Sequence, residues 1–432
     1  MSNLNYSKAF SMRRFLNWFP LGMAYATLYM GRYSYIPAKE EFKGGLMDNA
    51  GLGFMTMVGA IVYGVSFLFN GPLTDKIGGR KAMIISTAGS AVVNLAMGLL
   101  IYANWTEHFV MKMAILYGVN MYFQSFAAIA IVKVNSNWFH ISERGVFGGI
   151  FGILISSGLF LAYTVSPFIM GLFFKGQPQF YFLIPSFLLV FMMFVTIMLI
   201  RDTPEECGFP EFTTGTATQF DSDVKLSTMQ IIKQVITHPI VISIAFIELC
   251  TGVLRDGMFH WFGAFAKQAD SPVRAWLGIG LFIAGASGSM VAGWISDKLF
   301  NSRRPPVAML LYGVIIVALV VAAFVMKFAP TSVKPLIMFF VVVVVAFGVI
   351  GTHGVLSGAA TADFGGKQAT ATATGIIDGF VYLGVAIQGI GLGTLTSKGW
   401  EYWIPFLIPF AVMGFFLSFR VRNVKPAMRA GH

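Results

Sequence analysis

The stretch that organises this chain reads Gly71-Pro-Leu-Thr-Asp75-Lys76-Ile-Gly-Gly-Arg80-Lys81, and a second version of it reads Gly293-Trp-Ile-Ser-Asp297-Lys298-Leu-Phe-Asn-Ser-Arg303-Arg304. Each version places Gly-x-x-x-Asp-Lys at the end of a long apolar run and follows it with a pair of basic residues. The second version begins 222 positions after the first. A pattern repeated at this offset indicates a chain built from two homologous halves.

Long apolar runs accompany both versions along the whole chain. Of its 432 residues, 56% are hydrophobic and only 11% are charged, and the mean hydropathy is +0.73. This balance excludes an ordinary soluble domain. A helix needs roughly 20 apolar residues to cross about 30 Å of hydrocarbon. Twelve segments are expected to do so: 15-37, 51-73, 82-103, 109-133, 145-173, 180-200, 239-266, 274-297, 306-328, 335-357, 370-396 and 402-420.

Six of these segments lie on each side of a polar stretch, 201-237, that is rich in Asp, Glu and Thr. The sequence therefore predicts an all-α membrane protein whose 12 transmembrane helices form two pseudo-symmetric six-helix halves. We expect residues 1-200 to form the N-terminal six-helix bundle, 201-237 a cytoplasmic linker, and 238-432 the C-terminal six-helix bundle. Two six-helix halves are a transporter architecture.

The distribution of basic residues predicts the orientation in the membrane. With the N-terminus inside, the inner segments hold eighteen Lys and Arg residues and the outer segments hold nine. Because basic residues concentrate on the cytoplasmic side, both termini and the linker are expected in the cytoplasm. The same loops account for the net charge of +11, so no nucleic-acid partner is expected.

The two repeated loops are predicted to control gating. Their candidate gating residues are Asp75 and Arg80 in the first loop, and Asp297 and Arg303 in the second. Asp and Arg side chains can pair with helix ends or with each other at the inner face. Breaking and re-forming such pairs would let one half rock against the other. The alternative is a charged turn that only fixes the topology.

Three basic residues, Arg32, Lys133 and Arg255, fall within predicted membrane helices. A charge near the bilayer centre costs at least roughly 2.5–3.5 kcal/mol, so it is expected to face a cavity and a partner. Lys133 lies near the inner end of its helix, from which its side chain can instead reach the interface. Arg32 and Arg255 are 223 positions apart, which matches the offset of the loops and predicts that both lie between the halves.

Two arginines that face one cavity suit a phosphate, because each planar guanidinium can donate two hydrogen bonds to adjacent oxygens. The alternative is that each arginine is a structural partner of a nearby carboxylate or carbonyl. Tyr25 and Tyr29 precede Arg32 by seven and three positions, which places all three on one face of the helix. This stripe predicts a cavity wall that carries hydroxyl groups, although such stripes also arise from packing.

Four segments resemble the major facilitator superfamily and, within it, the organophosphate:phosphate antiporter family of glycerol-3-phosphate and hexose-phosphate transporters. They are Leu254-Arg255-Asp-Gly257 with Trp261, Gly293-Trp-Ile-Ser-Asp297-Lys-Leu-Phe, Trp138-Phe-x-x-x-Glu143-Arg144-Gly145, and Gly379-Phe-Val-Tyr382-Leu-Gly384. The resemblance covers nearly the whole chain. It implies a major facilitator fold and import of a phosphorylated small molecule in exchange for inorganic phosphate, by alternating access across a bacterial inner membrane.

The resemblance also implies roles for single residues. Arg32 and Arg255 match the family's phosphate-binding arginines, and Lys133 matches a basic residue that precedes the loop after the fourth helix. The residues that match tyrosines along the family's translocation path are Tyr25, Tyr29, Tyr63 and Tyr382. A carrier with two such halves is expected to work as a monomer within the lipid bilayer.

The chain departs from the family at three positions in the N-terminal half. Ile155 stands where the family has a histidine, Gly152 where an asparagine is usual, and Phe67 where the family has a lysine. Two polar contacts of the expected anion site are therefore missing from this half.

Acidic residues lie in the C-terminal half instead. Glu248 is seven residues before Arg255, about 10.5 Å from it along the helix axis. Asp256 follows Arg255 directly, and Asp378 lies in the eleventh predicted helix. Buried carboxylates can carry protons, so these three acids are possible coupling residues, either for protons or for a positive group on the substrate. The alternative is local charge balance for Arg255.

Three hypotheses about function follow from these residues. The first is an organophosphate:phosphate antiporter, the second a proton-coupled carrier of another organic anion or zwitterion, and the third a non-transporting sensor on the same scaffold. An enzyme is not expected, because no nucleophile–base or metal-ligand pattern is present, and no cofactor is predicted. We interpret His260 and His353, both in the C-terminal half, as packing or hydrogen-bonding residues.

Overall fold

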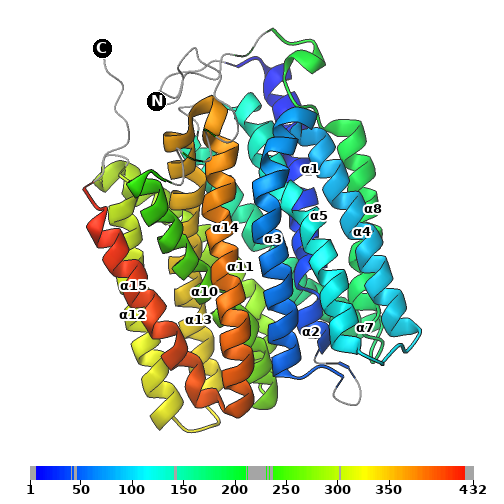
Figure 1. Ribbon diagram of the computed structural model, residues 1–432, viewed down its shortest axis with the longest axis vertical. Helices are drawn as coiled ribbons and strands as arrows, with labels where there is room; N and C mark the ends of the chain where they lie inside the picture. The colour runs from blue at the N-terminus through cyan, green and yellow to red at the C-terminus, as the bar shows by residue number, and fades with distance from the viewer. Residues whose placement is uncertain are drawn as a thin grey trace.

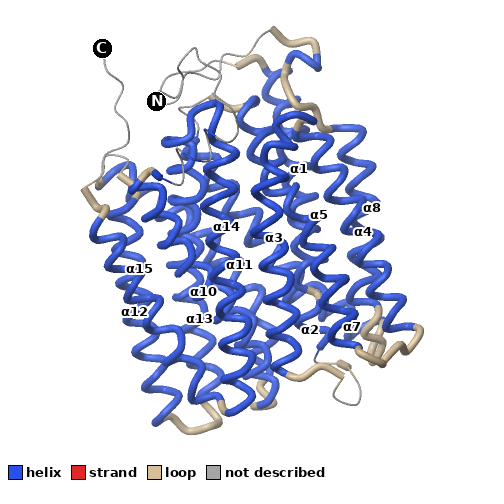
Figure 2. The backbone as a smooth tube through the Cα atoms, in the orientation of Figure 1, coloured by secondary structure: helices blue, strands red, loops and turns tan. Residues whose placement is uncertain are grey.

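The computed structural model describes the backbone of residues 6–39, 41–42, 46–140, 144–210, 212, 230, 233, 237–300 and 303–423. Within these ranges the side chains at 144–149, 151, 297 and 358–374 are not described. The described residues form helices and connecting turns and contain no strand (Figure 2).

The first six crossings are built from eight helices. They are α1 (Lys8–Tyr33), α2 (Tyr35–Lys39), α3 (Asn49–Ile77), α4 (Gly79–Tyr102), α5 (Phe109–Trp138), α6 (Arg144–Phe160), α7 (Ser166–Phe173) and α8 (Phe180–Leu199). The short α2 extends α1, and α6 continues into α7 through the π-helical turn Leu161–Val165. After α8 the chain makes the single 3₁₀ turn Glu205–Cys207.

The last six crossings begin after residue 238. They are α10 (Pro239–Gln268), α11 (Leu277–Leu299), α12 (Pro305–Phe328), α13 (Lys334–His353), α14 (Thr361–Lys398) and α15 (Trp403–Arg420). The 3₁₀ turns Pro272–Trp276 and Trp400–Tyr402 precede α11 and α15, and the π-helical segment Gly354–Ala360 joins α13 to α14.

Ten of these crossings are long and apolar enough to span a membrane by themselves. The other two are α1 and α10, the helices that carry Arg32 and Arg255. A helix that lines a polar interior does not need to be as apolar as one that faces lipid. The predicted all-α membrane fold is confirmed.

The outer surface is covered with large apolar side chains. Phe187 and Phe191 of α8, and Val317 and Phe324 of α12, are each more than half exposed. Apolar surface on this scale would be unusual against water, whereas lipid chains cover it without cost.

One predicted boundary is wrong. We expected a loop at 358–369, but the backbone remains helical from α13 through Gly354–Ala360 into α14. The alanines in this stretch favour helix enough to outweigh the glycines that suggested a break. The segment predicted over 145-173 is helical from Arg144 to Phe173. A π-helical turn, Leu161–Val165, lies within it just before Pro167, which lacks the N–H that a regular helix needs.

Two seams join the first six crossings to the last six. Figure 1 shows α3 and α14 side by side at the centre of the molecule, and α6 packs against α11 in the second seam. In the first seam the backbones touch, because a Cβ atom on Gly53 would lie 2.2 Å from the carbonyl oxygen of Gly389. In the second, a Cβ on Gly152 would lie 2.2 Å from the hydroxyl of Ser289. Small residues therefore permit the close approach at both seams.

The described start of α1 and the described end of α15 lie at the same end of the molecule, together with the residues that follow α8 (Figure 1). An even number of crossings produces this arrangement. The sequence-based division into 1-200, 201-237 and 238-432 and the cytoplasmic side of this end stay predictions.

Candidate functional site

Arg32 of α1 lies at the centre of the molecule with an exposed fraction of only 1%. Its guanidinium donates three hydrogen bonds, one each to the side chains of Gln124 of α5, Tyr63 of α3 and Tyr382 of α14. The Nε atom lies 2.8 Å from Gln124 Oε1, Nη2 lies 2.9 Å from the Tyr63 hydroxyl, and Nη1 lies 2.6 Å from the Tyr382 hydroxyl. All three acceptors are uncharged. Within the described part of the chain, no carboxylate forms an ion pair with Arg32.

Aromatic rings surround the same guanidinium. Its central carbon lies 4.7 Å from the ring centre of Tyr29, 4.5 Å from that of Tyr63 and 5.8 Å from that of Tyr382. The guanidinium of Arg255 lies 5.5 Å from the ring of Tyr382 as well. One tyrosine of α14 therefore contacts the arginines of both α1 and α10, through attraction between each cation and the ring face.

Arg255 is bound differently from Arg32. Its Nε donates to Oδ1 of the adjacent Asp256 at 2.8 Å, so its charge is partly balanced within α10. Its Nη2 is buried and has no hydrogen-bond partner among the described residues. A buried donor without a partner costs about 1–3 kcal/mol. An anion oxygen placed beside Nη2 would remove that cost.

The space beside the arginines is small. A cavity of about 10 Å³ is bordered by Arg32, Tyr33, Asp256 and Tyr382, among others. A volume of this size holds about one water molecule. We expected a water-accessible hollow here, whereas the cavity between these described side chains is too small for an organophosphate.

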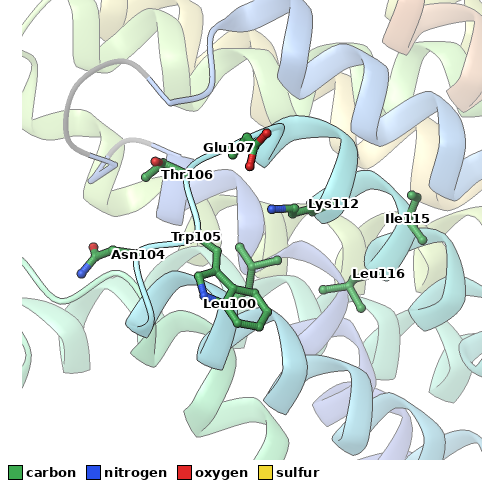
Figure 3. Close-up of a pocket in the computed structure, with 8 residues that line it drawn as sticks. All are labelled: Leu100, Asn104, Trp105, Thr106, Glu107, Lys112, Ile115 and Leu116. Atoms are coloured by element: carbon green, nitrogen blue, oxygen red, sulfur yellow. The ribbon is translucent and has the colours of Figure 1, made fainter.

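Two larger hollows among the described residues lie elsewhere. One of about 750 Å³ lies at the connection from α4 to α5, where Leu100, Trp105, Glu107 and Lys112 border it (Figure 3). Another, of about 320 Å³, lies next to the turn before α15 and includes Trp400. None of the residues that border either hollow is a predicted site residue, so size alone does not identify the functional site.

The predicted tyrosine stripe on α1 forms a continuous row of rings. The ring centres of Tyr25 and Tyr29 are 5.2 Å apart, and those of Tyr29 and Tyr33 are 5.5 Å apart. The row continues to His260 of α10, whose ring lies 5.0 Å from that of Tyr33. All four side chains are buried, so the row connects α1 to α10 beside the arginines.

The acidic residues of the last six crossings form two groups. Asp256 contacts Arg255 and lies 3.7 Å from His260. Glu248 lies 2.8 Å from Nδ1 of His353 on α13, in a second group. Asp378 of α14 joins this second group through Ser357, which lies four residues after His353 on the continuing helix and donates a hydrogen bond to Asp378 Oδ1 at 2.5 Å.

Comparison with known proteins identifies the family. Residues 21–389 match the family model described as the Major Facilitator Superfamily. The chain belongs to this superfamily. A solved structure of a bacterial homologue of the human lysosomal transporter Spinster, in an inward-facing and unoccupied conformation, has the same fold. Its TM-score is 0.67 at 15% identity, with 98% of this chain and 100% of that chain covered.

Curated relatives of this major facilitator protein include three with informative names. The glycerol-3-phosphate transporter of Bacillus subtilis is 26% identical over 84% of this chain and 81% of its own. The membrane sensor protein UhpC of Salmonella typhimurium is 25% identical, over 88% and 84%. The probable hexose phosphate transport protein of Chlamydia trachomatis is 24% identical, over 95% and 90%. The resemblance to organophosphate:phosphate antiporters is confirmed, and the chain is a multi-pass membrane protein of a transporter superfamily and not an enzyme.

In the first repeated loop of this major facilitator protein, both candidate gating residues have partners. Asp75 forms an ion pair with Lys133 at 2.7 Å, and both side chains are about one-third exposed. The guanidinium of Arg80 donates to the carbonyl oxygen of Ile197 near the C-terminal end of α8 at 2.5 Å. The backbone N–H of Arg80 donates to Asp202, whose carboxylate thereby caps the start of α4. The loop therefore connects α3, α4, α5 and α8 at this end.

Lys133 is thus separated from the arginine pair. It lies nine residues after Gln124 on α5, roughly 13 Å further along the helix by its rise per residue, and its partner is Asp75.

The second repeated loop is described only in part. Arg303 donates through Nε to the carbonyl oxygen of Phe300 at 3.1 Å. The side chain of Asp297 lies outside the described residues.

The departures from the family pattern leave apolar groups near the site. The ring of Phe67 is buried, 4.6 Å from that of Tyr63 and 6.3 Å from that of Tyr382. Ile155 is buried too. The N-terminal half therefore has Arg32 beside an apolar ring where the family pattern has a second cation.

Sequence reasoning missed Gln124. Its amide is uncharged, so it does not stand out in an apolar helix as an arginine does. A signal was present, however, because Asn120 and Gln124 are spaced by four residues in α5 and share one helix face. The two amides are hydrogen-bonded to each other at 3.4 Å.

Proposed function

We propose that this protein carries an organophosphate of the sugar phosphate or glycerol phosphate class across a bacterial inner membrane in exchange for inorganic phosphate, by alternating access. One observation carries the proposal. Two buried guanidiniums, one from each half, contact the same tyrosine ring, and Nη2 of Arg255 has no partner among the described residues. The names of the Bacillus and Chlamydia relatives support the class of cargo.

Arg32 and Arg255 would bind the phosphoryl group from opposite sides. Phosphate oxygens form charge-assisted hydrogen bonds that are roughly twice as strong as neutral ones. A bound phosphate therefore competes well with the hydroxyls of Tyr63 and Tyr382 for the donors of Arg32. The four tyrosines predicted to line the path, at positions 25, 29, 63 and 382, would then form the polar part of the wall.

Exchange follows from the charges. Without an anion, two guanidiniums approach each other in a poorly screened interior, and that repulsion opposes closure. A bound anion offsets the repulsion, so the carrier crosses in either direction more readily when it is loaded. Asp75, Arg80, Asp297, Arg303 and Lys133 would act at the inner gate; the pairs of Asp75, Arg80 and Lys133 lie within the first six crossings, so they would hold that half together as the halves rock. We propose that one chain suffices and that the gate and both termini are cytoplasmic.

The test is phosphate counterflow in proteoliposomes loaded with inorganic phosphate. Arg32→Lys and Arg255→Lys should each lower exchange at least about tenfold, because loss of one hydrogen bond to a charged group costs about 1.5–3 kcal/mol. Arg274→Lys, at an exposed position in the turn before α11, serves as the matched control and should exchange normally. Full exchange in either site variant would reject the role of these arginines.

Flux also separates transport from sensing, the role that the name of the Salmonella relative describes. A sensor would bind phosphate, and so raise the melting temperature of the purified protein, without exchange in liposomes. That combination of results would overturn the proposed transport.

A further inference from the structure

Three titratable side chains meet in the last six crossings, apart from the arginine pair. Glu248 comes from α10, His353 from the end of α13, and Asp378 from α14. Glu248 and His353 are hydrogen-bonded at 2.8 Å. Asp378 accepts a hydrogen bond from Ser357, four residues after His353 on the continuing helix. We call these three residues the acidic cluster. Neither the loops nor the phosphate site uses it.

The acidic cluster is buried. Glu248 has no exposed surface, and Asp378 and His353 are 7% and 8% exposed. The Oε1 atom of Glu248 has no hydrogen-bond partner among the described residues. An ionised carboxylate with an unpaired oxygen is costly in such surroundings, whereas a protonated one is not. Adding a proton to the acidic cluster should therefore lower its free energy strongly.

The groups that face the cluster do not neutralise it. On α10 these are Arg255, which is paired with Asp256, and the thiol of Cys250. The phenol of Tyr312 approaches from α12 and donates to the carbonyl oxygen of Ile247, next to Glu248. Tyr382 lies on α14, four residues after Asp378. Arg255 is the only cation among these described neighbours, and Asp256 already balances its charge.

An ionised cluster would oppose a bound phosphate. Glu248 lies seven residues before Arg255 on α10, about 10.5 Å along the helix axis, and Asp378 lies four residues before Tyr382, the tyrosine that contacts both arginines. Negative charge on these carboxylates would repel a phosphate dianion bound at the arginines, at a cost that a low dielectric makes large. Protons on the acidic cluster would remove that repulsion without weakening the contacts between phosphate and arginine.

We infer that the acidic cluster takes up protons together with the phosphate-bearing substrate, so that organophosphate transport is coupled to the proton gradient. The inference rests on the proposed function. A proton from water on the loading side adds to the Glu248–His353 pair, which becomes imidazolium with carboxylate or imidazole with carboxylic acid. It returns to water on the opposite side when the anion leaves, and no bond other than those to the proton changes.

The first test compares uptake of labelled phosphate into phosphate-loaded liposomes at equal pH and with the outside made acidic. The unaltered protein should take up more label when the outside is acidic. Glu248→Gln, Asp378→Asn and His353→Gln should lose this stimulation while exchange at equal pH persists, which also shows that the variants are folded. Glu107→Gln and His108→Gln, the same substitutions at exposed positions, should keep the stimulation.

A second test needs no flux and so separates this inference from the proposed transport. Inorganic phosphate, adjusted to the pH of the sample, is added to weakly buffered purified protein, and the pH is followed. The unaltered protein should take up protons on binding, and Glu248→Gln should lose that uptake. Binding without proton uptake in the unaltered protein, or equal stimulation by acid in all three cluster variants, would overturn the inference. If the unaltered protein takes up protons when it binds phosphate but shows no exchange in liposomes, only the proposed transport is rejected.

Discussion

Neutral acceptors surround Arg32, and this sets how it responds to an anion. Its three hydrogen bonds go to an amide and two phenols, so its full charge remains available. Arg255, in contrast, shares its charge with Asp256. The two arginines are therefore not equivalent, even though they occupy corresponding positions in the repeat. We expect Arg32 to supply most of the attraction for an anion and Arg255 to supply a directed donor.

Tyr382→Phe tests whether a hydroxyl holds the place of an anion oxygen. The change keeps the ring and removes the acceptor for Nη1 of Arg32, which leaves a buried donor unpaired at a cost of about 1–3 kcal/mol. We expect a lower melting temperature without phosphate and a smaller deficit in saturating phosphate, because the anion supplies the missing acceptor. Tyr402→Phe, at a 45% exposed position, is the control. If the melting temperature falls equally with and without phosphate, a phosphate oxygen does not replace the Tyr382 hydroxyl as the acceptor for Arg32.

At this scale, the sequence predicted the charged residues better than their partners. Arg32 and Arg255 stood out because a charge in an apolar helix is costly, and the repeat offset related them. Tyr63 and Tyr382 came only from the resemblance. The pair of Lys133 with Asp75 could not be foreseen from spacing, because the two residues lie on different helices and meet only after α3 packs on α5.

The seam between α3 and α14 shows how helix contacts position the site. Gly53 meets the backbone of Gly389 and Gly393, and Gly64 meets that of Gly379 further along the same helices. Between these contacts α3 presents Tyr63 and α14 presents Tyr382, the two residues that reach Arg32. The close approach of the backbones therefore sets the distance between the two phenols.

Gly53→Ala should disrupt this seam. A Cβ at this position would lie 2.2 Å from a backbone oxygen and 2.8 Å from a backbone carbon, and backbone atoms cannot rotate away. Overpacking costs about 1–3 kcal/mol. The arrangement in which α3 and α14 are in contact should therefore become roughly 5- to 150-fold less populated. Phosphate exchange in liposomes should slow accordingly. Gly263→Ala on α10, where a Cβ meets nothing within 4 Å, should exchange normally; an effect of the same size there would contradict the role of the seam.

The apolar runs predicted most elements because roughly 20 consecutive apolar residues have few alternatives to a membrane helix. The continuous helical backbone from α13 into α14 was not predicted, because the local residue types point in two directions. Its glycines and polar residues suggest a loop, but the many alanines keep the backbone helical. The seams could not be predicted, since the sequence shows a glycine but not which helix will approach it.

The whole molecule has an end at which the chain after α8 packs back onto the first helices. Trp138 of α5 donates to the carbonyl oxygen of Arg201, and Asn17 of α1 accepts from the backbone N–H of the same residue. Arg13 donates to the sulfur of Cys207 at 3.2 Å. Both cysteines of the chain are free, but Cys207 is partly exposed and Cys250 is buried. This difference provides a direct test of orientation.

A membrane-impermeant maleimide should label the protein in inverted membrane vesicles and not in intact spheroplasts. The expectation follows from the cytoplasmic position predicted for residues 201-237, with Cys207 as the accessible thiol. Cys207→Ser should abolish the labelling, since Cys250 is shielded. Labelling in intact spheroplasts would show that the orientation predicted from the basic residues is reversed.

The two crossings that do not qualify as membrane spans by their own length and composition, α1 and α10, are also the first of each six-helix set, and this has a consequence for biogenesis. Arg255 on α10 has the adjacent Asp256 as a partner within its own helix, whereas α1 would enter the bilayer poorly when it leaves the ribosome alone, because Arg32 has no partner until later helices arrive. The acceptors of Arg32 lie on α3, α5 and α14, so one of them is synthesised some 350 residues later. We expect α1 to stay close to the insertion machinery until α3 and α5 join it, and to reach its final depth only when nearly the whole chain has been made.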